Sequence, residues 1–270
     1  MDRLRDRVCL ITGSTGIAAA AAARCAVEGA AVFVISRTAD HARELADSLV
    51  AGGARAGWAA ADLADETATN AAVAAAVERF GRIDGCFSVA GGSGRRFGDG
   101  PIHELTMDGW DRTISLNLRS QAVVARAVTR VMLGQAPTEI GSRGSIVLVS
   151  SVLALEPVPE LFATHAYAAA KGAIVALMHS MAAAYAPSGI RVNVIAPGLT
   201  AMPMAARAAS DPTTAEFATR KQPLVGGFLA ADDVAPAAVY LLSDESRAVT
   251  GQCLAVDGGW SVTSASPGAG

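Results

Sequence analysis

The chain has few charged and few aromatic residues. Charged side chains make up 17% of its 270 residues and aromatic ones 5%, whereas apolar residues reach 51%. The net charge of −3 leaves no basic excess, and a nucleic-acid-binding protein needs a basic face to contact phosphates. The composition therefore argues against nucleic acid as a partner, and it predicts that some apolar surface is buried between subunits.

Cysteine is also scarce, and its spacing favours neither disulfides nor a metal site. The chain has four cysteines, Cys9, Cys25, Cys86 and Cys253. They are widely scattered and form no Cys-x-x-Cys pair, so we expect reduced thiols and a cytoplasmic location. The four histidines show no spacing typical of metal ligands, and we expect no metal.

The sequence lacks an apolar run that could cross a membrane. Residues 18–23 are apolar, but Arg24 and Glu28 end that run far short of the roughly 20 residues a span needs. The charged start, Met-Asp-Arg-Leu-Arg-Asp-Arg, leads directly into an expected strand and predicts no signal peptide. We therefore expect no membrane partner.

Short β-branched runs alternate with longer alanine-rich stretches. The expected strands cover residues 8–12, 31–36, 56–60, 83–89, 145–151, 191–196 and 253–256. The expected helices cover residues 17–28, 39–50, 65–80, 106–133, 166–186 and 232–242. Continuous apolar strands separated by helices are typical of a parallel sheet covered on both faces. The sequence thus predicts an α/β fold, a doubly wound, Rossmann-like parallel sheet of about seven strands.

The irregular segments indicate where a ligand binds. We expect residues 1–262 to form one domain and residues 263–270 a flexible tail. Residues 91–104, 152–164 and 199–229 each follow a strand. Because ligands bind beyond the carboxyl ends of the strands in such sheets, these loops should form the walls and lid of a substrate pocket. Their many Leu, Val, Phe, Met and Pro residues favour a mainly apolar substrate.

The first expected strand leads through a glycine-containing turn into a helix. The turn reads Thr12-Gly13-Ser14-Thr15-Gly16-Ile17-Ala18. Glycines let the backbone approach a pyrophosphate, and a helix N-terminus supplies N–H groups and a positive dipole end. A tight turn without a ligand is the alternative. The position after the first strand of an α/β pattern favours a dinucleotide site.

The second and third strands end where an adenosine would lie. Ser36, Arg37 and Thr38 stand where an acidic residue would bind the 2′-hydroxyl of NAD. Arg37 can instead receive a 2′-phosphate, which favours NADP(H) over NAD(H), although a solvated arginine after a strand is the alternative. Asp62 and Leu63 are placed to contact the adenine, but aspartate is also common in turns.

Polar groups with catalytic potential gather near the later strands. Tyr167 and Lys171 are four residues apart and share one helix face. A nearby ammonium favours phenolate and lowers the pKa of a tyrosine, which is ordinarily about 10. Ser150 and Ser151 end the fifth strand, where a hydroxyl can bind a substrate oxygen. Asn117 lies within a helix, where a satisfied or solvent-facing polar residue is the alternative.

In their order and spacing these residues resemble the short-chain dehydrogenase/reductase family in its compact single-domain form, over residues 8 to about 260. The resemblance implies that Tyr167 is the general acid/base and that Ser151 orients the carbonyl. It implies that Lys171 lowers the Tyr167 pKa and binds the nicotinamide ribose. Asn117 would hold a water that links Lys171 to solvent. Further matches are Ser88-Val89-Ala90-Gly91, Pro197-Gly198, Thr250-Gly251-Gln252 and Asp257-Gly258-Gly259.

These patterns together place a nicotinamide cofactor against the carboxyl ends of the strands. The residues predicted to contact it are Gly13, Ser14, Thr15, Gly16, Ile17, Ser36, Arg37, Thr38, Asp62, Leu63, Ala90, Gly91, Tyr167, Lys171, Pro197, Gly198 and Thr200.

The chain departs from the family pattern at several points. Its glycine turn is one residue shorter and ends in Ala18 instead of glycine, which should shift the backbone around the pyrophosphate. Ser88 replaces an asparagine, and Met202 stands where a cofactor-binding threonine is common. The segment from Ser151 to Tyr167 is a few residues longer than usual and should change the substrate pocket more than the chemistry.

The leading hypothesis is an NAD(P)-dependent oxidoreductase acting on a carbonyl or a secondary alcohol. Hydride moves between the nicotinamide and the carbonyl carbon while Tyr167 exchanges a proton with the oxygen. A 3-oxoacyl thioester, a cyclic ketone or a secondary-metabolite intermediate would fit. Arg95 and Arg96 could contact an anionic group, although loop arginines are more often solvated.

The sequence is also compatible with a function other than turnover. The shortened turn motivates a second hypothesis, a catalytically impaired dinucleotide-binding sensor or scaffold of the same fold. Nucleophilic hydrolysis is rejected because no Gly-x-Ser-x-Gly elbow is present. The resemblance further implies self-association through the helices at 106–133 and 166–186, as a homotetramer or otherwise a dimer.

Overall fold

Seven strands pair in one parallel sheet, in the order β3-β2-β1-β4-β5-β6-β7. The computed structural model describes residues 2–202 and 210–264. The strands are β1 (Val8–Thr12), β2 (Ala31–Ser36), β3 (Ala56–Ala60), β4 (Gly85–Ser88), β5 (Gly144–Val149), β6 (Ile190–Pro197) and β7 (Cys253–Val256). The predicted doubly wound α/β fold is confirmed, with four strands at their predicted bounds and the other three differing by a residue or two at each end.

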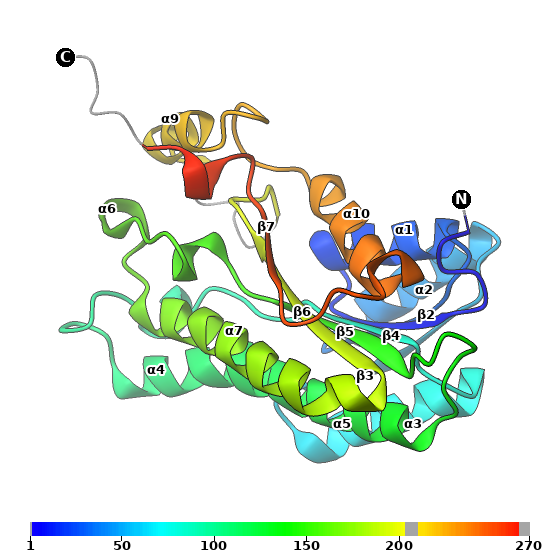
Figure 1. Ribbon diagram of the computed structural model, residues 1–270. Coiled ribbons are helices and arrows are strands. Elements are labelled where there is room, and N and C mark those ends of the chain that lie inside the picture. Colours follow the sequence, from blue (N-terminus) through cyan, green and yellow to red (C-terminus); the bar gives the residue numbers. More distant parts are fainter. Residues whose placement is uncertain (1, 203–209, 265–270) are drawn as a thin grey trace.

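Helices cover both faces of the sheet (Figure 1). One face carries α1 (Ile17–Val27), α2 (Ala39–Ala51) and α10 (Ala231–Leu242). The other carries α3 (Glu66–Phe80), α4 (Met107–Ile114), α5 (Ser120–Gly134) and α7 (His165–Tyr185). Successive strand side chains point to opposite faces, so Cys9 and Ile11 pack in the first layer and Leu10 in the second. A sheet covered on both faces thus requires the continuous apolar strands that the sequence contains.

The helix ends follow local sequence signals. The side chain of Asp65 accepts a hydrogen bond from the Ala68 N–H (2.8 Å) and caps α3. Thr106 caps α4 in the same way. Gly29 and Gly81 follow α1 and α3 with φ of 91° and 84°, the left-handed conformation that ends a helix.

Two expectations about irregular and helical segments need correction. The predicted helix at 106–133 is interrupted by a π-helical turn, η2 (Ser115–Arg119). Where the predicted loops fall within the described residues, they contain the helices α6 (Pro159–Phe162) and α9 (Pro212–Lys221). Residues 203–209 of the predicted loop 199–229, and residues 265–270 of the predicted tail, lie outside the described residues.

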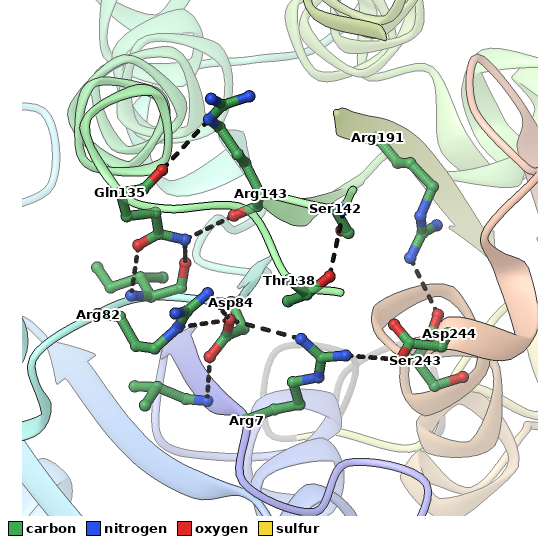
Figure 2. Close-up of polar contacts among 12 residues, drawn as sticks. Arg7, Arg82, Asp84, Gln135, Thr138, Ser142, Arg143, Arg191, Ser243 and Asp244 are labelled. Carbon is green, nitrogen blue, oxygen red and sulfur yellow. Dashed lines mark hydrogen bonds and ion pairs between the residues drawn. The ribbon is translucent and has the colours of Figure 1, made fainter. Parts of the chain in front are cut away.

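The amino-terminal edge of the sheet carries a network of arginines and acids (Figure 2). Asp84, just before β4, accepts a hydrogen bond from Arg82 Nε at 2.8 Å. Arg7 lies between Asp84 (3.7 Å) and Asp244 (2.5 Å). Arg191 of β6 donates to backbone carbonyls, and burial lowers its pKa to about 10. The network therefore ties the amino ends of strands together, at the edge opposite to their carboxyl ends.

Within the described segments, no helix combines the length and the apolar character needed to span a bilayer.

Candidate active site

The four residues predicted to be catalytic come together beyond the carboxyl end of β5. Ser151 follows that strand, and its side chain lies close enough to the Tyr167 hydroxyl to lower the pKa of that phenol in part. Lys171 Nζ lies 5.5 Å from the centroid of the Tyr167 ring. Asn117 Oδ1 and Lys171 Nζ lie on one side of Gly91, at 2.7 and 3.5 Å from the place a Cβ would take there. The structure thus gathers groups from β5, α7 and η2 at one point.

Hydrogen bonds fix α7 against the end of β5. Lys171 is 3% exposed, and its Nζ donates to the Val149 carbonyl at 2.9 Å. In return, Ser150 Oγ donates to the backbone carbonyl of Lys171 at 2.7 Å. Burial lowers the pKa of Lys171 to about 7, because an ammonium loses its hydration there. Ser150, which the sequence offers beside Ser151 as a ligand of the substrate oxygen, therefore binds the backbone of α7.

The pKa of Tyr167 moves in the direction opposite to the prediction. Withdrawal of the hydroxyl from water raises the pKa, and the nearby Ser151 side chain lowers it in part. The expected lowering by Lys171 is absent here, because the same burial drives the lysine toward its neutral form. The phenol is consequently protonated near neutral pH, which is the form that can donate a proton.

Asn117 is fully buried and lies in the π-helical turn. Its Nδ2 donates to the carbonyls of Thr113 and Gly92, both at 2.9 Å. Its Oδ1 accepts from the Gly92 N–H at 3.0 Å. The side chain takes the carbonyl of Thr113, four residues earlier, that a regular helix would give to a backbone N–H. The expanded turn is the kind of local irregularity that is frequent at functional sites.

The glycine turn ends at an uncapped helix N-terminus. Gly16, the N-cap of α1, has φ 56°, and neither a side-chain cap nor an acidic residue occupies the first turn. These features fit a pyrophosphate, which would accept the N–H groups that no side chain engages. Met202 covers this place, since its Sδ lies 2.9 Å from where a Cβ on Gly16 would be. The methionine therefore lies against the predicted phosphate cradle.

The predicted adenosine end is open to solvent. Ser14 Oγ donates to Ser36 Oγ at 3.0 Å, which links the glycine turn to the end of β2. Arg37 is exposed, and among the described residues no hydrogen bond or ion pair engages it. Asp62 is exposed too, and its Oδ1 accepts from the Ala64 N–H at 3.0 Å. Asp62 thus stabilises a turn, which is one of the two roles that the sequence predicts for it.

The segment before Gly91 is held by a residue that the sequence analysis did not single out for this role. The buried Thr12 Oγ1 accepts hydrogen bonds from the N–H groups of Val89 (3.0 Å) and Ala90 (3.1 Å). Ser88, which replaces the usual asparagine, is buried with no partner for its hydroxyl among the described residues. Thr12 therefore braces this segment at the end of β1.

Gln222 likewise holds the Pro197-Gly198 segment. It is fully buried, and its Oε1 accepts from the Leu199 N–H at 2.6 Å while its Nε2 donates to the Leu199 carbonyl at 3.1 Å. Thr200 is also buried, and its Oγ1 donates to the carbonyl of Gly198 at 3.1 Å. Its Nε2 also donates to the nearby Gly227 carbonyl at 2.6 Å, but no local pattern marks its contact with Leu199, which lies 23 residues earlier.

A comparison with known families identifies this arrangement. A family model described as Enoyl-(Acyl carrier protein) reductase matches residues 11–261. The chain belongs to the short-chain dehydrogenase/reductase family. It is 35% identical to 2-(S)-hydroxypropyl-CoM dehydrogenase 3 of Xanthobacter autotrophicus, over 96% of this chain and 98% of that protein.

Two further relatives bear on the family assignment. The chain is 37% identical to an A-factor type gamma-butyrolactone 1'-reductase of Streptomyces virginiae, over 96% of this chain and 97% of that one. It also resembles the crystal structure of a gluconate 5-dehydrogenase candidate from Beutenbergia cavernae with bound NADP, with a TM-score of 0.84, 32% identity, and coverage of 95% and 97%.

The chain is therefore an oxidoreductase of a family that acts on alcohol and ketone groups with NAD(P). Within residues 2–202 and 210–264, no three His, Cys, Asp or Glu side chains gather in a way that could hold a metal ion.

Proposed function

We propose that this short-chain dehydrogenase/reductase reduces the carbonyl of a mainly apolar substrate, or oxidises the corresponding secondary alcohol, with NADP(H) in preference to NAD(H). The observation that carries the proposal is the contact between the Tyr167 hydroxyl and Ser151, with Lys171 and Asn117 beside them. A binding module has no need of a matched proton donor and oxygen ligand. The presence of both groups therefore favours an active enzyme over the alternative, a catalytically impaired sensor or scaffold.

The proposed roles follow from the hydrogen bonds of each group. Ser151 Oγ accepts from the Leu153 N–H at 3.2 Å, so its own proton points to the substrate oxygen or to Tyr167. Tyr167 Oη gives its proton to the substrate oxygen as negative charge develops there. Lys171 Nζ, held by Val149, faces the ring of Tyr167 and the proposed ribose site.

The proposed cofactor contacts extend along the carboxyl ends of the strands. The uncapped start of α1 would hold the pyrophosphate, and Arg37 would receive a 2′-phosphate. When bound, the reduced nicotinamide supplies the hydride. Held between Gly91 and Gly198, it would face the Tyr167–Ser151 pair, so that binding places the reacting groups in contact.

The substrate class is proposed from the loops. Ile102 of loop 91–104 and Leu155 of loop 152–164 are 63% and 41% exposed. Apolar side chains on both loops favour an apolar body around the carbonyl. A relative named as an A-factor type gamma-butyrolactone 1'-reductase is in keeping with this class.

We also propose that residues 1–262 form one domain and that the protein assembles as a homotetramer, with a dimer as the alternative, through α4, α5 and α7. The four cysteines are free thiols, which supports a reducing, cytoplasmic setting. Sedimentation at micromolar concentration tests the assembly, and a monomer would contradict it.

The cofactor proposal is tested by titrating the protein with NADPH and NADH while following tryptophan fluorescence. We expect tighter binding of NADPH, and in Arg37→Ala an NADPH affinity that falls to the NADH level with NADH binding unchanged. Equal affinities in the wild type would contradict the role of Arg37. Absence of binding to both at millimolar concentration would contradict the cofactor proposal and a dinucleotide-binding sensor alike, and would leave only a scaffold.

A further inference from the structure

The carboxylate of Asp99 caps the helix that carries Tyr167. Its Oδ1 accepts from the Ala166 N–H and its Oδ2 from the Tyr167 N–H, both at 3.0 Å. The residue before α7, Thr164, makes no side-chain cap of its own. Asp99 is 6% exposed and stands 67 positions before Ala166. The first turn of the helix thus relies on a residue of the substrate loop 91–104 for its cap.

The other end of the same loop is held by Asn117. The Asn117 side chain both donates to the Gly92 carbonyl and accepts from the Gly92 N–H. Between these anchors the loop lies directly on α4, since a Cβ on Gly94 would lie 1.9 Å from Thr113 Oγ1. The segment 92–99, called the strap below, is therefore fixed at one end by the Asn117 side chain and at the other by hydrogen bonds to the backbone of α7, including that of Tyr167.

The backbone contacts show what the strap controls. One of the two N–H groups that Asp99 holds is that of Tyr167 itself. Movement of the strap consequently moves the Cα of Tyr167, while Ser151 is held independently at the end of β5. Asp99 contacts neither the Tyr167 hydroxyl nor the place proposed for the cofactor.

We propose that Asp99 is a positioning residue, which sets where the Tyr167 hydroxyl stands relative to the substrate oxygen bound by Ser151. The inference rests on the proposed carbonyl reduction. It makes loop 91–104 both a wall of the substrate pocket and the support of the proton donor. A substrate that contacts this wall thereby also contacts the support of the group that protonates it.

The test compares Asp99→Ala and Asp99→Asn in steady-state ketone reduction with NADPH. Removing both hydrogen bonds should lower kcat about 10- to 100-fold, because a small misplacement of a reacting group has an effect of this size. Substrate KM and NADPH affinity should stay within twofold. Asp99→Asn keeps one oxygen acceptor and should recover part of the lost kcat. Amide exchange of Ala166 and Tyr167 should accelerate in Asp99→Ala.

Asp65→Ala is the matched control, because it removes an aspartate cap from α3, away from Tyr167. It should lower the unfolding temperature by about 2–4 °C and leave kcat within twofold. Wild-type kcat in Asp99→Ala despite faster exchange at α7 would overturn the inference, as would an equal loss of kcat in Asp65→Ala. A wild-type protein that reduces no ketone would instead contradict the proposed function itself.

Discussion

At the scale of single residues, the burial of Lys171, proposed to hold the nicotinamide ribose, costs stability. The lysine is 3% exposed, and its pKa falls from 10.5 to about 7 through loss of hydration. Because the unfolded chain keeps the proton up to about 10.5, unfolding takes up a proton between the two values. The destabilising contribution of Lys171 should therefore become smaller as pH rises across this window.

Lys171→Met should stabilise the protein and abolish turnover. The carbonyl of Val149 keeps a partner, since Gln121 Nε2 also donates to it at 2.9 Å. We expect the variant to be more stable by roughly 1–2 kcal/mol near pH 7, and this advantage to shrink toward about pH 10. Urea unfolding at several pH values without cofactor measures it. A variant that is less stable near pH 7 would show that the lysine is not penalised by burial.

Met202 should govern cofactor affinity through the space it occupies beside Gly16. Met202→Thr removes the sulfur that lies against the phosphate cradle and adds a hydroxyl able to bind a phosphate oxygen. We expect NADPH to bind at least about threefold more tightly, which corresponds to roughly 0.7 kcal/mol. Met202→Leu, which keeps the volume, serves as the control and should change little. Weaker binding by the threonine variant would mean that the methionine supports the cofactor.

At the scale of elements, Glu28 joins the end of α1 to the segment before β1. Its Oε2 accepts from the Asp2 N–H at 3.1 Å and its Oε1 from Arg3 Nη2 at 2.5 Å. The hydrogen bond with Arg3, above other causes, lowers the pKa of Glu28 from 4.5 to about 2. A depressed carboxylate pKa stabilises the fold above the unfolded value, and this contribution is lost as pH falls from 4.5 toward 2.

Glu28→Gln should accordingly destabilise the protein by roughly 1–2 kcal/mol near pH 6, and less near pH 3. Because the wild type and the variant share all other carboxylates, the titration of those groups cancels in the difference between their free energies of unfolding. Denaturant unfolding at both pH values tests it. An equal difference at both would rule out the charge of Glu28 as the cause.

Most elements could be predicted from the sequence because their signals are local. Strands β1, β2, β3 and β7 begin and end where the apolar runs do. Helix α9 had such a signal too, since Asp211 caps it and Pro212 takes its first position, but it was read as loop. The π turn at Asn117 could not be predicted, because it depends on the hydrogen bonds with Gly92 across the fold.

In the candidate site, too, the features with local signals could be predicted, and those that depend on distant contacts could not. The sequence placed Tyr167 and Lys171 on one helix face, and the structure has them there. The direction of the Tyr167 pKa was wrong, because burial cannot be judged from helix spacing. Asp99, Thr12 and Gln222 were missed as supports, since each acts on backbone groups far away in the sequence.

At the scale of the whole molecule, one edge of the sheet stabilises the fold and the opposite edge carries the proposed site. The amino edge holds the network around Asp84 (Figure 2), and the carboxyl edge holds the proposed site. Asp84→Ala removes a buried carboxylate from the half-buried Arg82 and from the Val8 N–H, so we expect a loss of about 1–3 kcal/mol with kcat unchanged at a temperature where the variant is folded. A large fall in kcat with folding intact would show that the two edges are coupled.

The measurement that tests the central claim most directly is the NADPH-dependent reduction of a panel of apolar ketones by the wild type and by Tyr167→Phe. The variant removes only the hydroxyl that lies against Ser151. We predict turnover by the wild type, a loss of about 10²–10⁴-fold in kcat for the variant, and unchanged NADPH affinity. A variant that binds NADPH and reduces the ketone at the wild-type rate would contradict the assignment of Tyr167 as the proton donor.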